Sequence, residues 1–297
     1  MIKNTIFAIL FICVICGIAK SDTIYVSDLK VGASSIRVFD SSGSGAIFAS
    51  GLNNPQGLAF DENHNLFVAE YRNNSILKYN PNGQSSVFVS GASGGLGSPV
   101  GLVFDPSGNL FVSNWGNGTI KKIDPFGHSA NFASGVNTAA GIAIDGNNNI
   151  YVANYHNGTI QKFNSLGQGS IFASGLNGPT GLAFDHNGNL FVSNWDNGTI
   201  RKFDSTGQST VFASGILYPN GLAIDSKDNL FVASFAPVPV VLKYNAIGQG
   251  SIFATGFNDP QYIAITVPES SSFILAIFGL IGLIAFRRVI YEKSTWR

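Results

Sequence analysis

The sequence is poor in charge. Only 11% of its 297 residues are Asp, Glu, Lys or Arg, and the 17 basic side chains balance the 17 acidic ones. Nucleic acids and acidic membrane surfaces attract proteins through an excess of positive charge. A chain without net charge gives no reason to expect either contact, so we predict no nucleic-acid partner.

Cysteine is also scarce, and both cysteines, Cys13 and Cys16, lie in an N-terminal segment that is typical of an export signal. A lysine supplies a positive start, residues 5–19 are apolar, and small residues follow where a signal peptidase cleaves. We predict a signal peptide at residues 1–21, with an uncleaved anchor as the alternative. The mature chain would then contain no cysteine, which excludes disulfides and thiolate metal sites.

Glycine, by contrast, is abundant, with 35 residues, and it marks an internal repeat. Successive copies begin at intervals of 44, 40, 40 and 40 residues, at Gly57, Gly101, Gly141, Gly181 and Gly221. Each copy holds four short apolar runs between turn residues; the fourth copy reads GLAFD, NLFVSNW, TIRKFD and TVFASG. A period near 40 residues with four strands per copy is typical of β-propeller blades.

Turn residues indicate how these runs are joined. Asn-Gly pairs such as Asn117-Gly118 predict tight hairpins, because both central residues of such a turn need a positive φ. A short carboxylate that ends the first strand can accept hydrogen bonds from the amides of the next turn. Such residues are Asp61, Asp105, Asp145, Asp185 and Asp225. We interpret the lysines that recur in the third strand as a solvated outer face: Lys78, Lys122, Lys162, Lys202 and Lys243.

The two ends of the repeat predict how the array closes. Residues 23–51 contain the second, third and fourth strands of a blade without a first strand, and residues 259–267 contain a lone first strand. The C-terminal strand would complete the N-terminal blade and leave no open sheet edge. We therefore predict an all-β, six-bladed β-propeller over residues 23–267. An open solenoid is the alternative that these complementary fragments disfavour.

The wording of the blades, GLAFDxxGNLFVSNxxNGTIxKFD, resembles NHL-repeat propellers and the wider group that contains gluconolactonases and streptogramin lyases. The resemblance covers residues 23–267 and implies the propeller fold, but one propeller fold hosts many activities. In gluconolactonase-like enzymes a divalent metal lies at the mouth of the channel, held largely by residues that precede the first-strand glycine. Here those positions hold Gln56, Val100, Ala140, Thr180, Asn220 and Gln261, of which Asn220 alone matches the pattern.

These residues give little support to an enzyme. The set contains no carboxylate, and a hard dication bound by amides and a hydroxyl would be held poorly. The four histidines all fall in turns: His64, His128, His156 and His186. We predict no catalytic residue, no metal and no cofactor. The alternative is a metal-dependent lactonase- or lyase-like enzyme, for which His156 or His186 would have to converge with Glu70.

A second ring of residues follows the second strand of each blade. It comprises Asp28-Leu29, Glu70-Tyr71, Asn114-Trp115, Asn154-Tyr155, Asn194-Trp195 and Ser234-Phe235. Flat aromatic rings beside amides could stack on a sugar and hydrogen-bond it. The alternative is that the aromatics fill gaps between blades and the amides bond neighbouring turns. We take the polar and aromatic members, except Leu29 and Ser234, together with Asn220 as candidate ligand-binding residues. Asp28, Glu70 and the segments 92–97 and 236–241 are the candidates for specificity.

The C-terminal segment VPESSSFILAIFGLIGLIAFRR resembles a PEP-CTERM sorting tail over residues 268–297. The matching features are Pro268-Glu269, an apolar helix, and Arg287-Arg288, although Ser270 stands where a second proline is usual. We predict a transmembrane helix at residues 272–290 with a cytoplasmic C-terminus, since basic residues follow it. A buried core helix is the alternative. The resemblance implies an exosortase-like enzyme that processes the tail.

Together these patterns predict an exported protein of the cell envelope or cell surface, anchored in the membrane by its tail before processing. The propeller would be a non-enzymatic scaffold that binds a polysaccharide or a protein at its mouth. A purely structural envelope component without a small ligand is also open, as is release of the protein after cleavage.

Overall fold

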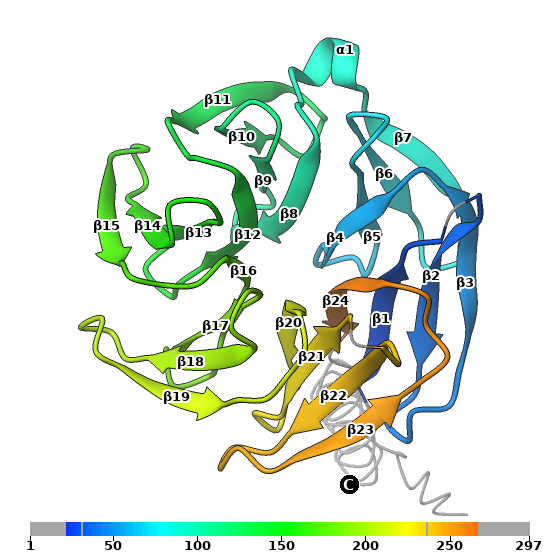
Figure 1. Ribbon diagram of the computed structural model, residues 1–297. Helices are drawn as coiled ribbons and strands as arrows, with labels where there is room; N and C mark the ends of the chain where they lie inside the picture. Colours follow the sequence, from blue (N-terminus) through cyan, green and yellow to red (C-terminus); the bar gives the residue numbers. More distant parts are fainter. Residues whose placement is uncertain (1–21, 31, 236, 267–297) are drawn as a thin grey trace, which may run out of the picture. The chain divides into compact units, whose positions relative to one another are not determined.

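Six antiparallel sheets of four strands surround a common axis in the computed structural model (Figure 1). The structure describes residues 22–30, 32–235 and 237–266. The predicted signal peptide and the predicted sorting tail, including Pro268, Glu269, Arg287 and Arg288, lie outside these residues. Within them, no helix has the length and apolar character needed to cross a membrane. The predicted six-bladed β-propeller is confirmed.

Each sheet is one blade, and its strands follow one another outward from the axis. Blade 1 consists of β24 (Pro260–Thr266), β1 (Thr23–Asp28), β2 (Ser34–Phe39) and β3 (Gly45–Leu52). Blade 2 consists of β4 (Pro55–Phe60), β5 (Leu66–Glu70), β6 (Ser75–Tyr79) and β7 (Ser85–Val89), and a short helix α1 (Gly91–Gly94) follows it. Blade 3 consists of β8 (Pro99–Phe104), β9 (Leu110–Asn114), β10 (Thr119–Ile123) and β11 (Ser129–Ser134).

The remaining blades repeat this order. Blade 4 consists of β12 (Ala139–Ile144), β13 (Ile150–Asn154), β14 (Thr159–Phe163) and β15 (Gly169–Ala173). Blade 5 consists of β16 (Pro179–Phe184), β17 (Leu190–Asn194), β18 (Thr199–Phe203) and β19 (Ser209–Ala213). Blade 6 consists of β20 (Pro219–Ile224), β21 (Leu230–Ser234), β22 (Val240–Tyr244) and β23 (Gly250–Ala254).

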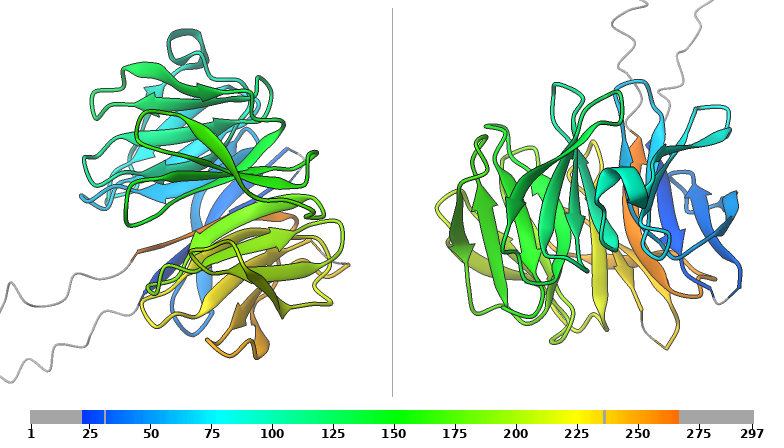
Figure 2. Two further views of the ribbon diagram at one scale, coloured as in Figure 1. Left: turned by 90° about the vertical axis from the view of Figure 1, so that its left-hand side faces the viewer. Right: turned by 90° about the horizontal axis from the view of Figure 1, so that it is seen from above.

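Blade 1 joins the two ends of the propeller, as the sequence predicts. Strand β24 pairs antiparallel with β1, with Thr23 opposite Thr266 and Tyr25 opposite Ala264. Figures 1 and 2 show the orange strand β24 beside the blue strand β1. Because this pairing supplies the missing first strand, the hydrogen-bonded ladder of blade 1 is complete and the ring has no gap.

The core lies between neighbouring blades. In blades 2 to 6 the second strands are buried along their whole length, because each has a neighbouring sheet on both faces. Between blades 2 and 3, for example, Phe67 meets Phe88 and Phe104 edge to face, with ring centroids 4.9 Å apart in both pairs. Repetition of this contact between successive blades makes a set of similar cores.

The inner strands contact one another in a closed circle, and glycine permits the approach. A Cβ atom on Gly141 would overlap the carbonyl oxygen of Thr180 in the next blade, and one on Gly181 would overlap that of Asn220. The first-strand glycines that mark the repeat are therefore required by close packing around the axis. Blade 1 has Tyr262 at this position instead.

Serines in alternate blades join the inner strands. The Ser113 hydroxyl accepts a hydrogen bond from the Gly101 amide at 2.8 Å and donates one to the Ala140 carbonyl of the next blade at 2.5 Å. Ser27 and Ser193 also donate to carbonyls of the next blade, at 2.7 and 2.6 Å. In the other three blades alanine occupies the same place, at Ala69, Ala153 and Ala233. The serines thus link the blades in pairs at the axis.

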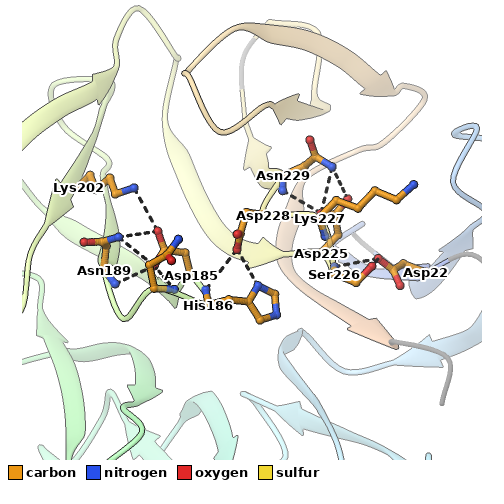
Figure 3. A network of polar contacts seen from close by, with 11 residues as sticks. Asp22, Asp185, His186, Asn189, Lys202, Asp225, Ser226, Lys227, Asp228 and Asn229 are labelled. Atoms are coloured by element: carbon orange, nitrogen blue, oxygen red, sulfur yellow. Dashed lines mark hydrogen bonds and ion pairs between the residues drawn. The ribbon is translucent and has the colours of Figure 1, made fainter. Parts of the chain in front are cut away.

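The aspartates at the ends of the first strands organise the turns that lead to the second strands, as predicted. Asp185 accepts hydrogen bonds from the amides of Asn187 at 3.0 Å and Asn189 at 2.8 Å (Figure 3). Burial alone would raise the pKa of the Asp185 carboxyl, but the hydrogen bonds from Asn189 and the charge of Lys202 lower it. The same pair of turn hydrogen bonds recurs in five blades.

The prediction that the third-strand lysines form a solvated outer face is incomplete, because each lysine also makes two contacts within its blade. The Lys202 ammonium lies 3.1 Å from the Asp185 carboxylate and 5.0 Å from the centre of the Phe191 ring. The equivalent lysines of blades 2, 3, 4 and 6 make the same two contacts. Each lysine therefore connects the turn aspartate to the second strand of its own blade.

We predict that Gly141→Ala destabilises the propeller by about 1–3 kcal/mol, because the added methyl group would be forced against the backbone of the next blade. Chemical denaturation monitored by circular dichroism measures the change. Gly146→Ala in the same blade is the matched control, since a Cβ atom there meets nothing within 4 Å. Equal stability of the two variants would contradict the role assigned to the first-strand glycines.

Candidate functional site

A cavity of about 390 Å³ opens at the face where the inner strands begin and the second strands end. It is lined by Asn54, Gln56, Tyr71, Val100, Trp115, Ala140, Tyr155, Thr180, Trp195, Asn220, Gln261 and Tyr262. The sheet register explains this composition, since Pro179 at the start of β16 pairs with Asn194 at the end of β17. The two rings of residues that the sequence singles out therefore meet at one cavity.

A bulge places the residue before each first-strand glycine at the cavity. In blade 5, Pro179 pairs with Asn194 and Leu182 with Val192, so two residues of β16 oppose one residue of β17. The same irregularity occurs at this point in blades 2, 3, 4 and 6. Such bulges bend a strand and redirect its side chains. Thr180 and its equivalents accordingly line the axis.

The polar members of the second ring are buried and hold the loops in place. This set is Asp28, Glu70, Asn114, Asn154 and Asn194, and each side chain is at most 5% exposed. The side-chain oxygen Oδ1 of Asn114 accepts a hydrogen bond from the backbone amide of Gly97 at 3.0 Å, and the backbone amide of Trp115 donates to the Ser98 carbonyl at 3.1 Å. We call this pair of bonds the loop clamp.

The loop clamp recurs in blades 1 to 5 with different side chains. Glu70 accepts from the Asn53 amide at 3.0 Å, and Asp28 accepts from the amides of Asn258 and Asp259 at 2.9 Å. In blade 6 the Ser234 hydroxyl instead donates to the Leu217 carbonyl at 2.7 Å. The structure thus places these polar residues under the loops rather than along the cavity.

The aromatic members line the cavity in blades 2 to 5, and we call Tyr71, Trp115, Tyr155 and Trp195 the aromatic wall. The rings of Trp115 and Tyr155 lie 5.5 Å apart. The Tyr155 hydroxyl donates to the Asp196 carboxylate of the next blade at 3.0 Å. Burial, and then this hydrogen bond, raise the pKa of Tyr155, so the phenol stays protonated at neutral pH. Phe235 lies outside the lining of the cavity.

The residues before the first-strand glycines divide the lining into two sides. Blades 3 and 4 contribute Val100 and Ala140, whereas blades 5, 6, 1 and 2 contribute polar side chains. We call Asn220, Gln261 and Gln56 the amide arc. The side-chain amide Nδ2 of Asn220 donates to Oε1 of Gln261 at 2.9 Å, and Nε2 of Gln261 donates to the Asp259 carboxylate. These hydrogen bonds orient the amides at the cavity.

The donor set does not fit a catalytic metal. Among the described residues that line the cavity, none is Asp, Glu or His, and a hard dication prefers charged oxygen ligands. No group of three or more His, Cys, Asp and Glu side chains within residues 22–30, 32–235 and 237–266 is arranged to hold a metal. Asn220, the one match to the metal-binding pattern, is engaged with Gln261.

The enzyme alternative requires Glu70 to converge with His156 or His186, but each of these side chains has other partners. Glu70 accepts hydrogen bonds from Asn73 and Ser75 in addition to its loop-clamp bond. His186 contacts Asp228 at 2.6 Å in a turn of the opposite face (Figure 3). His156 lies in an exposed turn of the cavity face and contacts the Thr138 hydroxyl at 2.9 Å.

Two residues of the lining, Tyr262 and Asn54, are not predicted from the sequence, although a signal for Tyr262 is present. DPQYIAI breaks the glycine register that NPQGLAF and the other copies keep, and the side chain that replaces hydrogen lies at the cavity. Burial strongly raises the pKa of the Tyr262 phenol, so this group is neutral at neutral pH. Nothing in the sequence context of Asn54 marks it.

Comparison with known proteins supports the fold. The family model for the NHL repeat matches residues 52–79 and 137–163. No curated protein has a significant match to the sequence. A chain in the crystal structure of a nidogen/laminin complex is 19% identical with a TM-score of 0.74; the match covers 84% of this chain and 100% of that one.

Two solved structures of lyases have similar folds. A streptogramin B lyase is 14% identical with a TM-score of 0.63, over 82% of this chain and 87% of that one. A virginiamycin B lyase from Staphylococcus aureus is 13% identical with a TM-score of 0.63, over 81% of this chain and 88% of that one. At these identities the likeness shows a shared propeller fold and leaves the activity to be argued from the site.

We predict that Asp259→Asn makes the protein more stable than the wild type at pH 7 but not at pH 4. Burial raises the pKa of the Asp259 carboxyl to about 6; the Gln261 hydrogen bond lowers it and the Asp28 carboxylate raises it. In the unfolded chain this pKa is about 3.9. The folded state therefore binds more protons between these values, and its stability falls as the pH rises from about 4 to 6.

Thermal unfolding from pH 4 to pH 7 tests this prediction. The substitution keeps an oxygen that can accept the Gln261 hydrogen bond but removes the buried charge. A difference in Tm between variant and wild type that does not change with pH would contradict it.

Proposed function

We propose that the chain is a non-catalytic binding scaffold whose cavity holds a neutral, hydroxyl-rich ligand such as a unit of a polysaccharide. The observation that carries the proposal is the division of the cavity into an aromatic wall and an amide arc. Aromatic faces stack on the apolar C–H faces of sugar rings, and side-chain amides can both donate to and accept from hydroxyl groups.

Three features of the site favour binding of a small, neutral ligand. The volume of about 390 Å³ lies within the usual range for small-molecule sites. None of the described lining residues carries a charge at neutral pH, so nothing compensates a charged ligand group. The loop clamps hold the aromatic wall before a ligand arrives, which reduces the entropic cost of binding.

A protein ligand is the other class of partner for such a scaffold. The structural neighbour in a nidogen/laminin complex comes from an assembly of proteins. The enzyme alternative is favoured by the two lyase neighbours, but the lining lacks a histidine and a carboxylate among its described residues. Stoichiometric retention of a divalent ion by the purified protein, lost in Asn220→Ala, would favour a lactonase- or lyase-like role over ours.

We also propose that the protein is exported and sorted at the cell surface. The apolar N-terminal segment at residues 5–19 supports export, and Pro268, Glu269, Arg287 and Arg288 support processing by an exosortase-like enzyme. In this proposal the helix at residues 272–290 anchors the protein before it is processed. A binding scaffold at the surface would then display its cavity to matrix polysaccharide.

The double variant Trp115→Ala and Trp195→Ala should bind neutral oligosaccharides at least about tenfold more weakly than the wild type, because it removes two stacking faces. A neutral glycan array identifies the probe, and titration calorimetry with the best binder measures the affinity.

Phe126→Ala is the control for lost aromatic surface, since Phe126 is 85% exposed in a turn of the opposite face. Its affinity should equal that of the wild type. Binding that survives the double variant would remove the aromatic wall from the proposal.

The sorting tail can be tested in the native host. Mass spectrometry of the surface-exposed protein should find wild-type chains that lack residues 273–286, whereas chains carrying Arg287→Ala and Arg288→Ala should retain them. The expected difference arises because the basic residues complete the motif that the processing enzyme would read. Recovery of the intact C-terminus from the wild type would show that the tail is an anchor and not a cleaved signal.

A further inference from the structure

The cavity face is not uniform, because blade 6 exposes apolar side chains there. Leu217 and Tyr218 before β20 are 52% and 46% exposed, and Phe235 after β21 is 39% exposed. At the position of Tyr218 the other blades have small or polar residues: Asn54, Ser98, Thr138, Gly178 and Asp259. An exposed aromatic pair at this face is therefore specific to blade 6.

Tyr218 has a backbone conformation that its loop could obtain with a less costly residue. Its φ is +50°, in the left-handed region, where a bulky side chain costs on the order of 1 kcal/mol or more. The loop uses only the Tyr218 carbonyl, which accepts a hydrogen bond from the Phe235 amide at 3.3 Å. Asn54 and Gly178 serve the same purpose in their blades at similar φ. The turn therefore gives no reason for an aromatic ring.

The two exposed rings continue the aromatic wall outward. Trp195, which lines the cavity, lies 5.2 Å from Tyr218 between ring centroids. It also lies 6.4 Å from Phe235, with the two ring planes only 10° apart. The three rings come from the end of β17 and the two ends of the β20–β21 hairpin. They form one surface that begins in the cavity and extends over blade 6.

We propose that Trp195, Tyr218 and Phe235 form a second subsite, which holds the next unit of a linear neutral oligosaccharide whose first unit occupies the cavity. This inference rests on the proposed function. The subsite is continuous with the cavity through Trp195 and is built of aromatic rings without a charged member. Asp196, the charged residue next to Trp195, is already engaged by the Tyr155 hydroxyl. A neutral ligand with flat apolar faces matches this chemistry.

Affinity should therefore increase with the length of the oligosaccharide. The probes are neutral cello-, xylo-, malto- and chito-oligosaccharides from monosaccharide to hexasaccharide, titrated by calorimetry. The test variants are Tyr218→Asn and Phe235→Leu, which place residues that the chain itself has at the same positions, Asn54 and Leu29. In the double variant the longer oligosaccharides should lose about tenfold in affinity, while the monosaccharide should be bound as by the wild type.

Two controls keep the outcome specific. Val211→Thr alters an outer-strand side chain that is 60% exposed, and it should change nothing. Tyr218→Asn should fold at least as stably as the wild type, because asparagine tolerates a left-handed backbone. Tm values establish this.

The results separate the two proposals. A wild type that binds none of the oligosaccharides contradicts the proposed function itself. A wild type that binds them, with a dependence on length that survives in the double variant, overturns the second subsite alone. The subsite is also overturned if an apolar peptide that contacts only Tyr218 and Phe235 displaces the bound oligosaccharide and the length of the glycan has no effect on affinity.

Discussion

The approach of each inner strand to the next around the axis is the constraint on which the rest of the structure depends. It requires glycine at one position of five blades, since a methyl group at Gly141 would overlap the backbone beyond it. The serine bonds from Ser27, Ser113 and Ser193 then fix the carbonyls of the next strand. Those carbonyls belong to Gln56, Ala140 and Asn220, so the bonds that close the ring also fix the backbone of the cavity.

Repetition and departure from repetition have different consequences in this molecule. The repeated residues make the frame: an aspartate with a lysine at one face, and a buried polar side chain that clamps a loop at the other. Two departures from the pattern place a tyrosine at the cavity face. Tyr262 replaces a glycine there, and Tyr218 replaces a small or polar residue. The repeated frame of the propeller requires neither substitution.

The candidate site could be predicted in part. The sequence predicts both Asn114 and Trp115 as ligand contacts because they are adjacent, but Asn114 is the last residue of β9 and Trp115 begins the turn that follows it. Which of the two lines the cavity depends on the bulge in the inner strand and on the loop that Asn114 clamps. Lys202 is similar, since its place in an alternating strand predicts exposure and does not indicate its contacts with Asp185 and Phe191.

The sequence by itself determined the architecture. The period of the copies and the complementary end fragments are local patterns, which can be read directly along the chain. It determined the aspartate turns for the same reason, since Asp185 and its equivalents bond to their neighbours in the chain. The predicted Asn-Gly turns are wrong in detail: Gly118 has a positive φ of 63° but Asn117 has not, because the hairpin between Asn114 and Thr119 has a four-residue loop. Tertiary structure alone decided that residues of six different inner strands share one cavity, and that Trp195, Tyr218 and Phe235 adjoin. Those contacts join positions in different blades, and the curvature that brings blades together is a property of the closed ring.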